Sequence, residues 1–185
     1  MPKEEVSRPH TSPRRNLPAT ATVKRNKEIS LTFLFPNMEA KATQALLNEL
    51  IETLKDGQKG YADAMTDVED ANLKETFKHY AVQRAGYITE IEDQMFKLDL
   101  KPEEESSVTS AVHRAWIDLK AALTSKDNKA VLSECERGED YAKKAFETAS
   151  KVEGLPAALK AVIEKQTSGV REAHDKIKAL RDAAK

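Results

Sequence analysis

Apolar residues recur every three or four positions over most of the chain, and this period constrains the fold more than any other feature of the sequence. Spacings of three and four place the apolar side chains on one face of an α-helix. No proline interrupts residues 37–101, so two long helices can form there, with apolar faces at residues 47–68 and 73–98. The link at residues 69–72 is short, which favours an antiparallel helical hairpin.

A second pair of helices is predicted in the C-terminal third of the chain. Asp127 precedes an apolar face that runs to Val152, and Gly154 is expected to end that helix. Pro156 suits the first turn of the last helix, whose apolar face reaches Leu180. No segment alternates apolar and polar residues as a half-buried strand does, so the predicted fold class is all-α.

A shorter helix is predicted between the two pairs, with an apolar face that runs from Val108 to Leu123 after the break at Pro102. Four long helices with a shorter helical connection in the middle predict a four-helix bundle with one crossover. A five-helix up-and-down bundle is the competing topology.

Residues 1–38 differ from the rest of the chain in composition. They contain seven Lys/Arg, three Glu and five of the seven prolines, and they show no apolar period. Such a segment cannot bury enough apolar surface to offset the entropy of ordering. We therefore expect a disordered basic tail at residues 1–38 and a bundle domain at residues 39–185. An alternative hypothesis is that translation begins at Met38 and that residues 1–37 lie outside the true start.

Charge and cysteine content limit the classes of function. Residues 39–185 carry 23 Lys/Arg against 28 Asp/Glu, a net charge of −5, which disfavours binding to nucleic acid. Many of these charges form acid-before-base pairs four residues apart, as Glu172 and Lys176 do, so we interpret them as solvated helix faces. The composition does not fit a membrane bundle. A single cysteine, Cys135, excludes a disulfide scaffold and fits a reducing cytoplasm.

Polar residues interrupt the apolar faces near mid-helix, where a bundle can hold metal. A di-iron centre needs inward glutamates and Glu-x-x-His motifs on facing helices, and no Glu-x-x-His occurs in the chain. We predict instead an inward polar layer whose members hydrogen-bond to one another and set the helix register. Its members are Gln58, Arg84, Glu139, Gln166 and His174. Arg84 is placed to pair with Glu139, and Tyr61 is interpreted as a core aromatic. The alternative is a mononuclear or partial metal site with Glu139 and His174 as ligands.

Three stretches of sequence suggest a family. Residues 47–57, 135–140 and 173–182 resemble a bacterial ferritin-like four-helix-bundle family of uncharacterised function. The resemblance covers roughly residues 43–184, and it implies a cytoplasmic ferritin-like bundle without a settled activity. Relatives in the broader ferritin-like group bind iron at the bundle centre, but their ligand motifs do not map onto this chain.

The leading hypothesis for function is a non-catalytic helical-bundle protein that acts through self-association, as a homodimer, or through a protein partner. One candidate role for such a protein is in a stress response. No cofactor is expected, and neither nucleic acid nor membrane is expected as a partner. The alternative is an iron-binding or ferroxidase-type ferritin-like protein with a degenerate site. A weaker third hypothesis is an anionic-surface or nucleic-acid binder that uses the basic tail.

Overall fold

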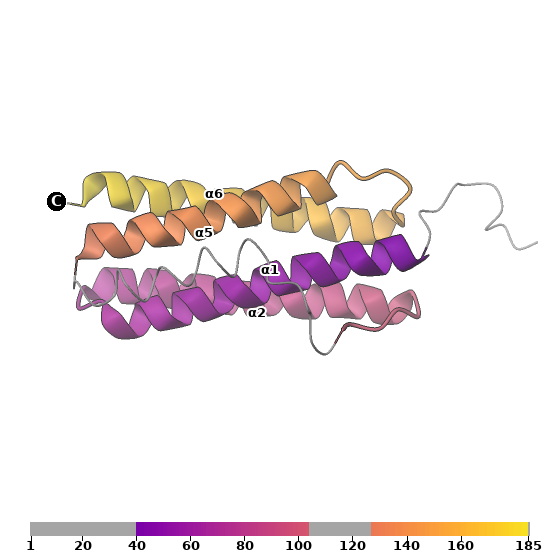
Figure 1. Cartoon of the computed structure of the whole chain (residues 1–185), viewed down its shortest axis with the longest axis horizontal. Coiled ribbons are helices and arrows are strands. Elements are labelled where there is room, and N and C mark those ends of the chain that lie inside the picture. The colour runs from indigo at the N-terminus through magenta and orange to yellow at the C-terminus, as the bar shows by residue number, and fades with distance from the viewer. Residues whose placement is uncertain (1–39, 104–126, 185) are drawn as a thin grey trace, which may run out of the picture. The chain divides into compact units, whose positions relative to one another are not determined.

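Four α-helices and no strand make up residues 40–103 and 127–184, which are the residues that the computed structural model describes (Figure 1). The helices are α1 (Ala40–Asp67), α2 (Ala71–Lys97), α5 (Asn128–Ala149) and α6 (Ala157–Ala183). The predicted all-α class and the four long helices are confirmed. The predicted tail and the shorter helix expected between Val108 and Leu123 lie outside the described residues. In the described part of the chain, no helix is both long enough and apolar enough to cross a membrane.

The helix ends follow from local capping. The side chain of Asp70 accepts hydrogen bonds from the backbone N–H groups of Asn72 and Leu73, at 2.8 and 3.1 Å, and so begins α2. Asp127 caps α5 in the same way through the N–H of Lys129, at 2.9 Å. These caps explain why α2 begins at Ala71, within the predicted link, and why α5 begins at Asn128, directly after Asp127.

The end of α5 differs from the prediction. The helix ends at Ala149, three residues before Val152. Shortly beyond it, backbone N–H groups donate hydrogen bonds to carbonyl groups three residues earlier, instead of four residues earlier as in an α-helix. Lys151 N–H bonds to Thr148 O at 3.2 Å and Val152 N–H bonds to Ala149 O at 3.1 Å, which tightens the chain out of the α-helix. Gly154, with φ of 79°, then lies in the link to α6.

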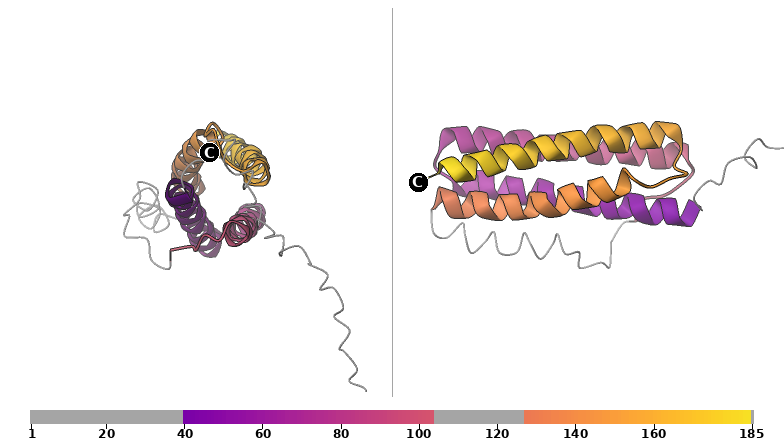
Figure 2. Two further views of the ribbon diagram at one scale, coloured as in Figure 1. Left: turned by 90° about the vertical axis from the view of Figure 1, so that its right-hand side faces the viewer. Right: turned by 90° about the horizontal axis from the view of Figure 1, so that it is seen from above.

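The four helices form a bundle in which neighbours are antiparallel. Going round the bundle the order is α1, α2, α6, α5, as the left-hand view of Figure 2 shows. Tyr61 of α1 contacts Glu139 of α5, and Gln166 of α6 contacts Tyr87 of α2. Since α2 and α5 are both antiparallel to α6, they run in the same direction, and the end of α2 and the start of α5 lie at opposite ends of the bundle.

The apolar core consists of two clusters, one toward each end of the bundle. One cluster is built around Tyr61, Phe77 and Leu132, and the other around Leu50, Ile91 and Phe146. Each cluster draws on all four described helices, so each holds the two hairpins together. The polar contacts described below lie between and beside these clusters.

α2 and α6 approach each other closely at Gly169. A Cβ atom at this position would overlap the hydroxyl oxygen of Tyr87 and would lie 3.1 Å from its Cζ. Gly86, in the middle of α2, is the opposite case, because a Cβ there would meet nothing within 4 Å. Packing among residues 40–103 and 127–184 therefore requires glycine at position 169 and does not require it at position 86.

The substitution Gly169→Ala is expected to destabilise the protein by about 1–3 kcal/mol, the usual cost of overpacking. Because the overlap is with a hydroxyl group, adding Tyr87→Phe should recover most of the loss. The control Gly86→Ala should leave stability unchanged or raise it by up to about 1 kcal/mol, since alanine favours helix. Denaturant unfolding in dilute solution measures all four proteins. Wild-type stability in Gly169→Ala would contradict the close approach.

Candidate functional site

A buried arginine occupies the middle of the bundle. The side chain of Arg84, from the centre of α2, is only 1% exposed and is the largest fully buried side chain among the described residues. Gly57 of α1 lies beside it, and a Cβ at Gly57 would stand in van der Waals contact with Arg84, 3.6 Å from Nε, so only a small residue fits there. The absence of a side chain on α1 thus allows a long cationic side chain to cross the interior from α2.

Glu139 of α5 receives this cation. The Nη2 group of Arg84 donates to both carboxylate oxygens of Glu139, at 2.6 and 2.7 Å, and Glu139 is likewise 1% exposed. The hydroxyl of Tyr61 on α1 donates to Glu139 Oε1 at 2.8 Å. Arg84 Nη1 donates to Gln83 Oε1 at 2.6 Å. Three helices therefore meet at one hydrogen-bonded ion pair. We call Tyr61, Arg84 and Glu139 the central triad.

Two members of the central triad, Arg84 and Tyr61, hold their protons more strongly than usual. Burial alone would lower the pKa of Arg84, but the Glu139 carboxylate more than offsets burial and raises that pKa above its usual value. Burial, with the charge of Glu139 next in importance, raises the pKa of Tyr61 well above its usual range. Tyr61 therefore stays a neutral donor and Arg84 stays a cation.

The buried thiol of Cys135 lies close enough to the central triad to be influenced by the charge of Glu139. Burial raises the pKa of Cys135 far above its usual value, and the negative charges of Glu139 and Glu134 add to the effect. A nucleophilic or metal-binding cysteine has to be a thiolate, so this environment favours the inert thiol of a packed core residue.

Gln166 makes polar contacts apart from the central triad. It is fully buried on α6, and its Nε2 donates to the carbonyl oxygen of Tyr87 and to Glu90 Oε2, both at 3.1 Å. Lys165 reaches the same carboxylate at 2.6 Å. Together these contacts fasten α6 to α2.

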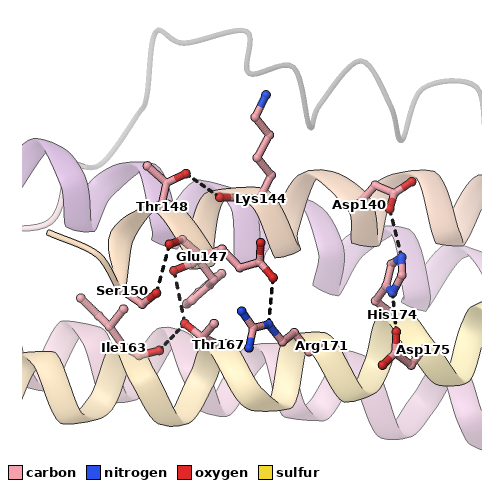
Figure 3. A network of polar contacts seen from close by, with 11 residues as sticks. Asp140, Lys144, Glu147, Thr148, Ser150, Ile163, Thr167, Arg171, His174 and Asp175 are labelled. Carbon is pink, nitrogen blue, oxygen red and sulfur yellow. Dashed lines mark hydrogen bonds and ion pairs between the residues drawn. The ribbon is translucent and has the colours of Figure 1, made fainter.

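His174 lies in the seam between α5 and α6 (Figure 3). Its ring is 6% exposed, with Nε2 3.0 Å from Asp140 Oδ1 and Nδ1 2.8 Å from Asp175 Oδ1. The hydrogen bond from His174 lowers the pKa of Asp175. Further along the seam, Arg171 donates to Glu147 at 2.8 Å. The imidazole therefore belongs to a row of polar contacts that joins the two helices near solvent.

The structure distributes the five predicted inward residues over separate places. Arg84 and Glu139 lie together, whereas Gln166 and His174 make the contacts just described. Gln58 is half-buried on α1, and within the described ranges no hydrogen bond joins it to Arg84 or Glu139. Gln166 and His174 are eight residues apart on one helix, about 12 Å along its axis, and so lie at different levels of the bundle.

Sequence reasoning missed the polar role of Tyr61. A tyrosine on an apolar helical face is ordinarily a packing residue, and here the ring does pack on Phe77 and Tyr80. Its hydroxyl, however, reaches the carboxylate on another helix. The signal that could have found it is Gly57, one turn earlier on the same face, which leaves space for a polar group at that level.

The residues at the bundle centre do not fit an iron centre. Both oxygens of Glu139 accept from Arg84, so the carboxylate charge is already balanced by a guanidinium. Both ring nitrogens of His174 face carboxylates of other residues. Within residues 40–103 and 127–184, no group of three or more His, Cys, Asp or Glu side chains is arranged to hold a metal ion.

Comparison with known proteins gives a family. Residues 42–152, more than half of the chain, match the family model of a domain of unknown function (DUF2383). The matched range includes α2, α5 and all but the first two residues of α1, and therefore all three residues of the central triad. No curated protein matches the sequence.

Breaking the buried ion pair should be costly. Glu139→Leu leaves the Arg84 charge buried without a partner, and Arg84→Met leaves Glu139 in the same state, so each should destabilise the protein by about 3–5 kcal/mol. The double substitution should cost much less than the sum, because no buried charge remains. Denaturant unfolding and a double-mutant cycle measure the coupling.

The matched control for this cycle is an exposed ion pair. Glu52→Gln removes the partner of Lys55 on the surface of α1, where the two groups lie 3.0 Å apart. It should cost less than about 1 kcal/mol. Additive effects of Arg84→Met and Glu139→Leu would show that the two charges are not coupled.

Alkaline pH should reveal the buried thiol. Because the pKa of Cys135 is raised, the unfolded chain releases this proton above about pH 9 while the folded protein keeps it, so stability falls as pH rises. Between pH 8 and pH 10 the wild type should lose about 1 kcal/mol more than Cys135→Ala, which lacks the group. Parallel unfolding free energies at the two pH values provide the measurement. An equal loss in both proteins would mean that the thiol titrates normally.

Proposed function

Since the chain belongs to a family of unknown function, that of the domain DUF2383, we propose a role for it from the geometry of the bundle. The protein is a ferritin-like helical-bundle protein of the bacterial cytoplasm with no catalytic activity of its own. It acts through self-association or through binding to a protein partner. A bundle with this role needs a rigid, well-specified interior and an outer surface that other chains can recognise.

The observation that carries this proposal is the central triad. In ferritin-like metal proteins, glutamates and Glu-x-x-His motifs project into the centre and share two cations. Here Arg84 supplies the positive charge at the centre, and both carboxylate oxygens of Glu139 accept hydrogen bonds from its guanidinium. Tyr61 adds a third anchor from α1. Such an interior specifies the register of the helices, which supports a structural role.

The arrangement of the helices supports the ferritin-like assignment. Two antiparallel hairpins pack side by side with α2 and α5 running in the same direction, as a bundle with one long connection between its second and third long helices requires. The three sequence stretches that resemble the ferritin-like family fall on α1, α5 and α6. The buried, protonated thiol of Cys135 is compatible with a reducing cytoplasm.

Metal content tests the non-catalytic interior. The full chain, purified from cells grown with added iron, should contain far less than one iron per chain, with the same content in His174→Ala and Glu139→Gln. Elemental analysis gives the metal content and circular dichroism verifies that each variant is helical. The control is Glu147→Gln, which removes an exposed carboxylate of α5. Near-stoichiometric iron that is lost in a folded His174→Ala or Glu139→Gln protein, and kept in the control, would overturn the proposal.

A further inference from the structure

We propose that the outer face of α2, centred on Gly86, is the surface through which the protein self-associates, and that a second copy packs there antiparallel about a two-fold axis. This inference rests on the proposed function and names the surface that self-association would use. Below, this surface is called the α2 face; its exposed members are Glu75, His79, Val82, Gly86, Thr89, Asp93, Phe96 and Lys97.

The middle of the α2 face is almost free of charge. One third of the residues in the chain are charged, yet residues 80–89 contain a single charged side chain, Arg84, which points into the core. The exposed residues of this stretch are Val82, Gly86 and Thr89, and Val82 is 66% exposed. Depletion of charge at the centre, with charged residues further out, is the composition that distinguishes protein interfaces from ordinary surface.

Among the described residues, no packing neighbour accounts for the glycine at position 86. Glycine in the middle of a helix costs about 1 kcal/mol relative to alanine. Gly57 and Gly169 are accounted for by Arg84 and Tyr87, which lie against them. At Gly86 nothing lies within 4 Å of the place where a Cβ would be. A glycine on an open helix face allows another backbone to approach closely, which a second helix across the α2 face would do.

The charges on either side of Gly86 favour a second copy in antiparallel orientation. His79 and Asp93 lie seven residues before and after Gly86, and Glu75 and Lys97 lie eleven residues before and after it. Seven and eleven residues are close to two and three helical turns, so all four positions share the side of α2 on which Gly86 lies. All four residues are exposed.

A two-fold axis through Gly86 brings Glu75 and Lys97 together as opposite charges, and His79 and Asp93 together as hydrogen-bonding partners. Each residue then faces the position at equal distance on the other side of Gly86 in the second copy, so His79 faces Asp93 and Glu75 faces Lys97. By symmetry each pair forms twice. A parallel pairing would place Glu75 against Glu75 and Lys97 against Lys97 of the other copy, which is repulsive. Charge complementarity therefore selects the antiparallel arrangement.

Exposed apolar side chains extend this surface. Phe96 is 85% exposed, ten residues beyond Gly86 at the edge of the α2 face, and would reach the second copy near Thr76. From Glu75 to Lys97 the α2 face is about 33 Å long and one helix wide. An interface of this size is at the small end of specific interfaces, so we expect a reversible dimer whose population depends on protein concentration.

Sedimentation velocity and light scattering on the full chain, over a concentration series, test the surface. The wild type should change from monomer to dimer. Gly86→Arg places a long side chain on the two-fold axis, and arginine favours helix over glycine, so the fold should be kept while the dissociation constant rises by about tenfold or more. The melting temperature of the dilute variant should equal or exceed that of the wild type.

A charge exchange tests the orientation. Glu75→Lys alone should weaken the dimer, because two cations then face each other, and adding Lys97→Glu should restore it to near the wild-type dissociation constant. The control is Lys59→Glu on the exposed side of α1, which should leave association unchanged.

The outcomes separate this inference from the proposed function. Equal dimerisation of the wild type and Gly86→Arg would overturn the α2 face while leaving self-association intact. A wild type that stays monomeric at every concentration would overturn both the surface and the self-association part of the proposed function. Loss of the dimer in Gly86→Arg without recovery in the double charge exchange would overturn the antiparallel orientation.

Discussion

The contact between Arg84 and Glu139 determines how the two helical hairpins can fit together. Arg84 lies in the hairpin of α1 and α2, and Glu139 lies in the hairpin of α5 and α6. Docking the hairpins removes both side chains from water, and burying either charge without the other would cost several kcal/mol. Sliding one hairpin by a helical turn, about 5.4 Å, would separate the charges in the same way. The buried pair therefore favours one register of the two docked hairpins.

Two of the buried glycines contribute to this arrangement, because a large side chain of α2 lies against each of them. Gly57 faces the stem of Arg84, and Gly169 faces the hydroxyl of Tyr87. In both cases the space left by a missing side chain on one helix is filled by a long side chain from α2. Because these long side chains lie against glycines, α2 can direct polar groups inward while the two apolar clusters on either side stay closely packed.

Sequence periodicity was sufficient for most of the fold and for part of the site. The apolar faces and the short link at residues 69–72 located the helices, since these signals are local, and the structure adds the caps at Asp70 and Asp127. The end of α5 was misplaced because a tightening last turn leaves no mark on apolar spacing. Arg84 and Glu139 could be paired from sequence because both interrupt apolar faces near mid-helix. Periodicity gives the direction of a side chain around its helix, but it does not give the stagger between helices. For that reason the sequence could not show that Gln166 and His174 lie at different heights along the bundle axis.

The seam at His174 has a consequence for how α5 and α6 are joined. Carboxylates accept hydrogen bonds and cannot donate them, so the contacts of this imidazole with Asp140 and Asp175 are both satisfied only when both ring nitrogens carry a proton. A neutral ring would present a lone pair to one of the two carboxylates. The two hairpins are thus joined by a charge pair enclosed in the interior, whereas α5 and α6 are joined along their edge through the carboxylates of Asp140 and Asp175, which remain 62% and 75% exposed to solvent.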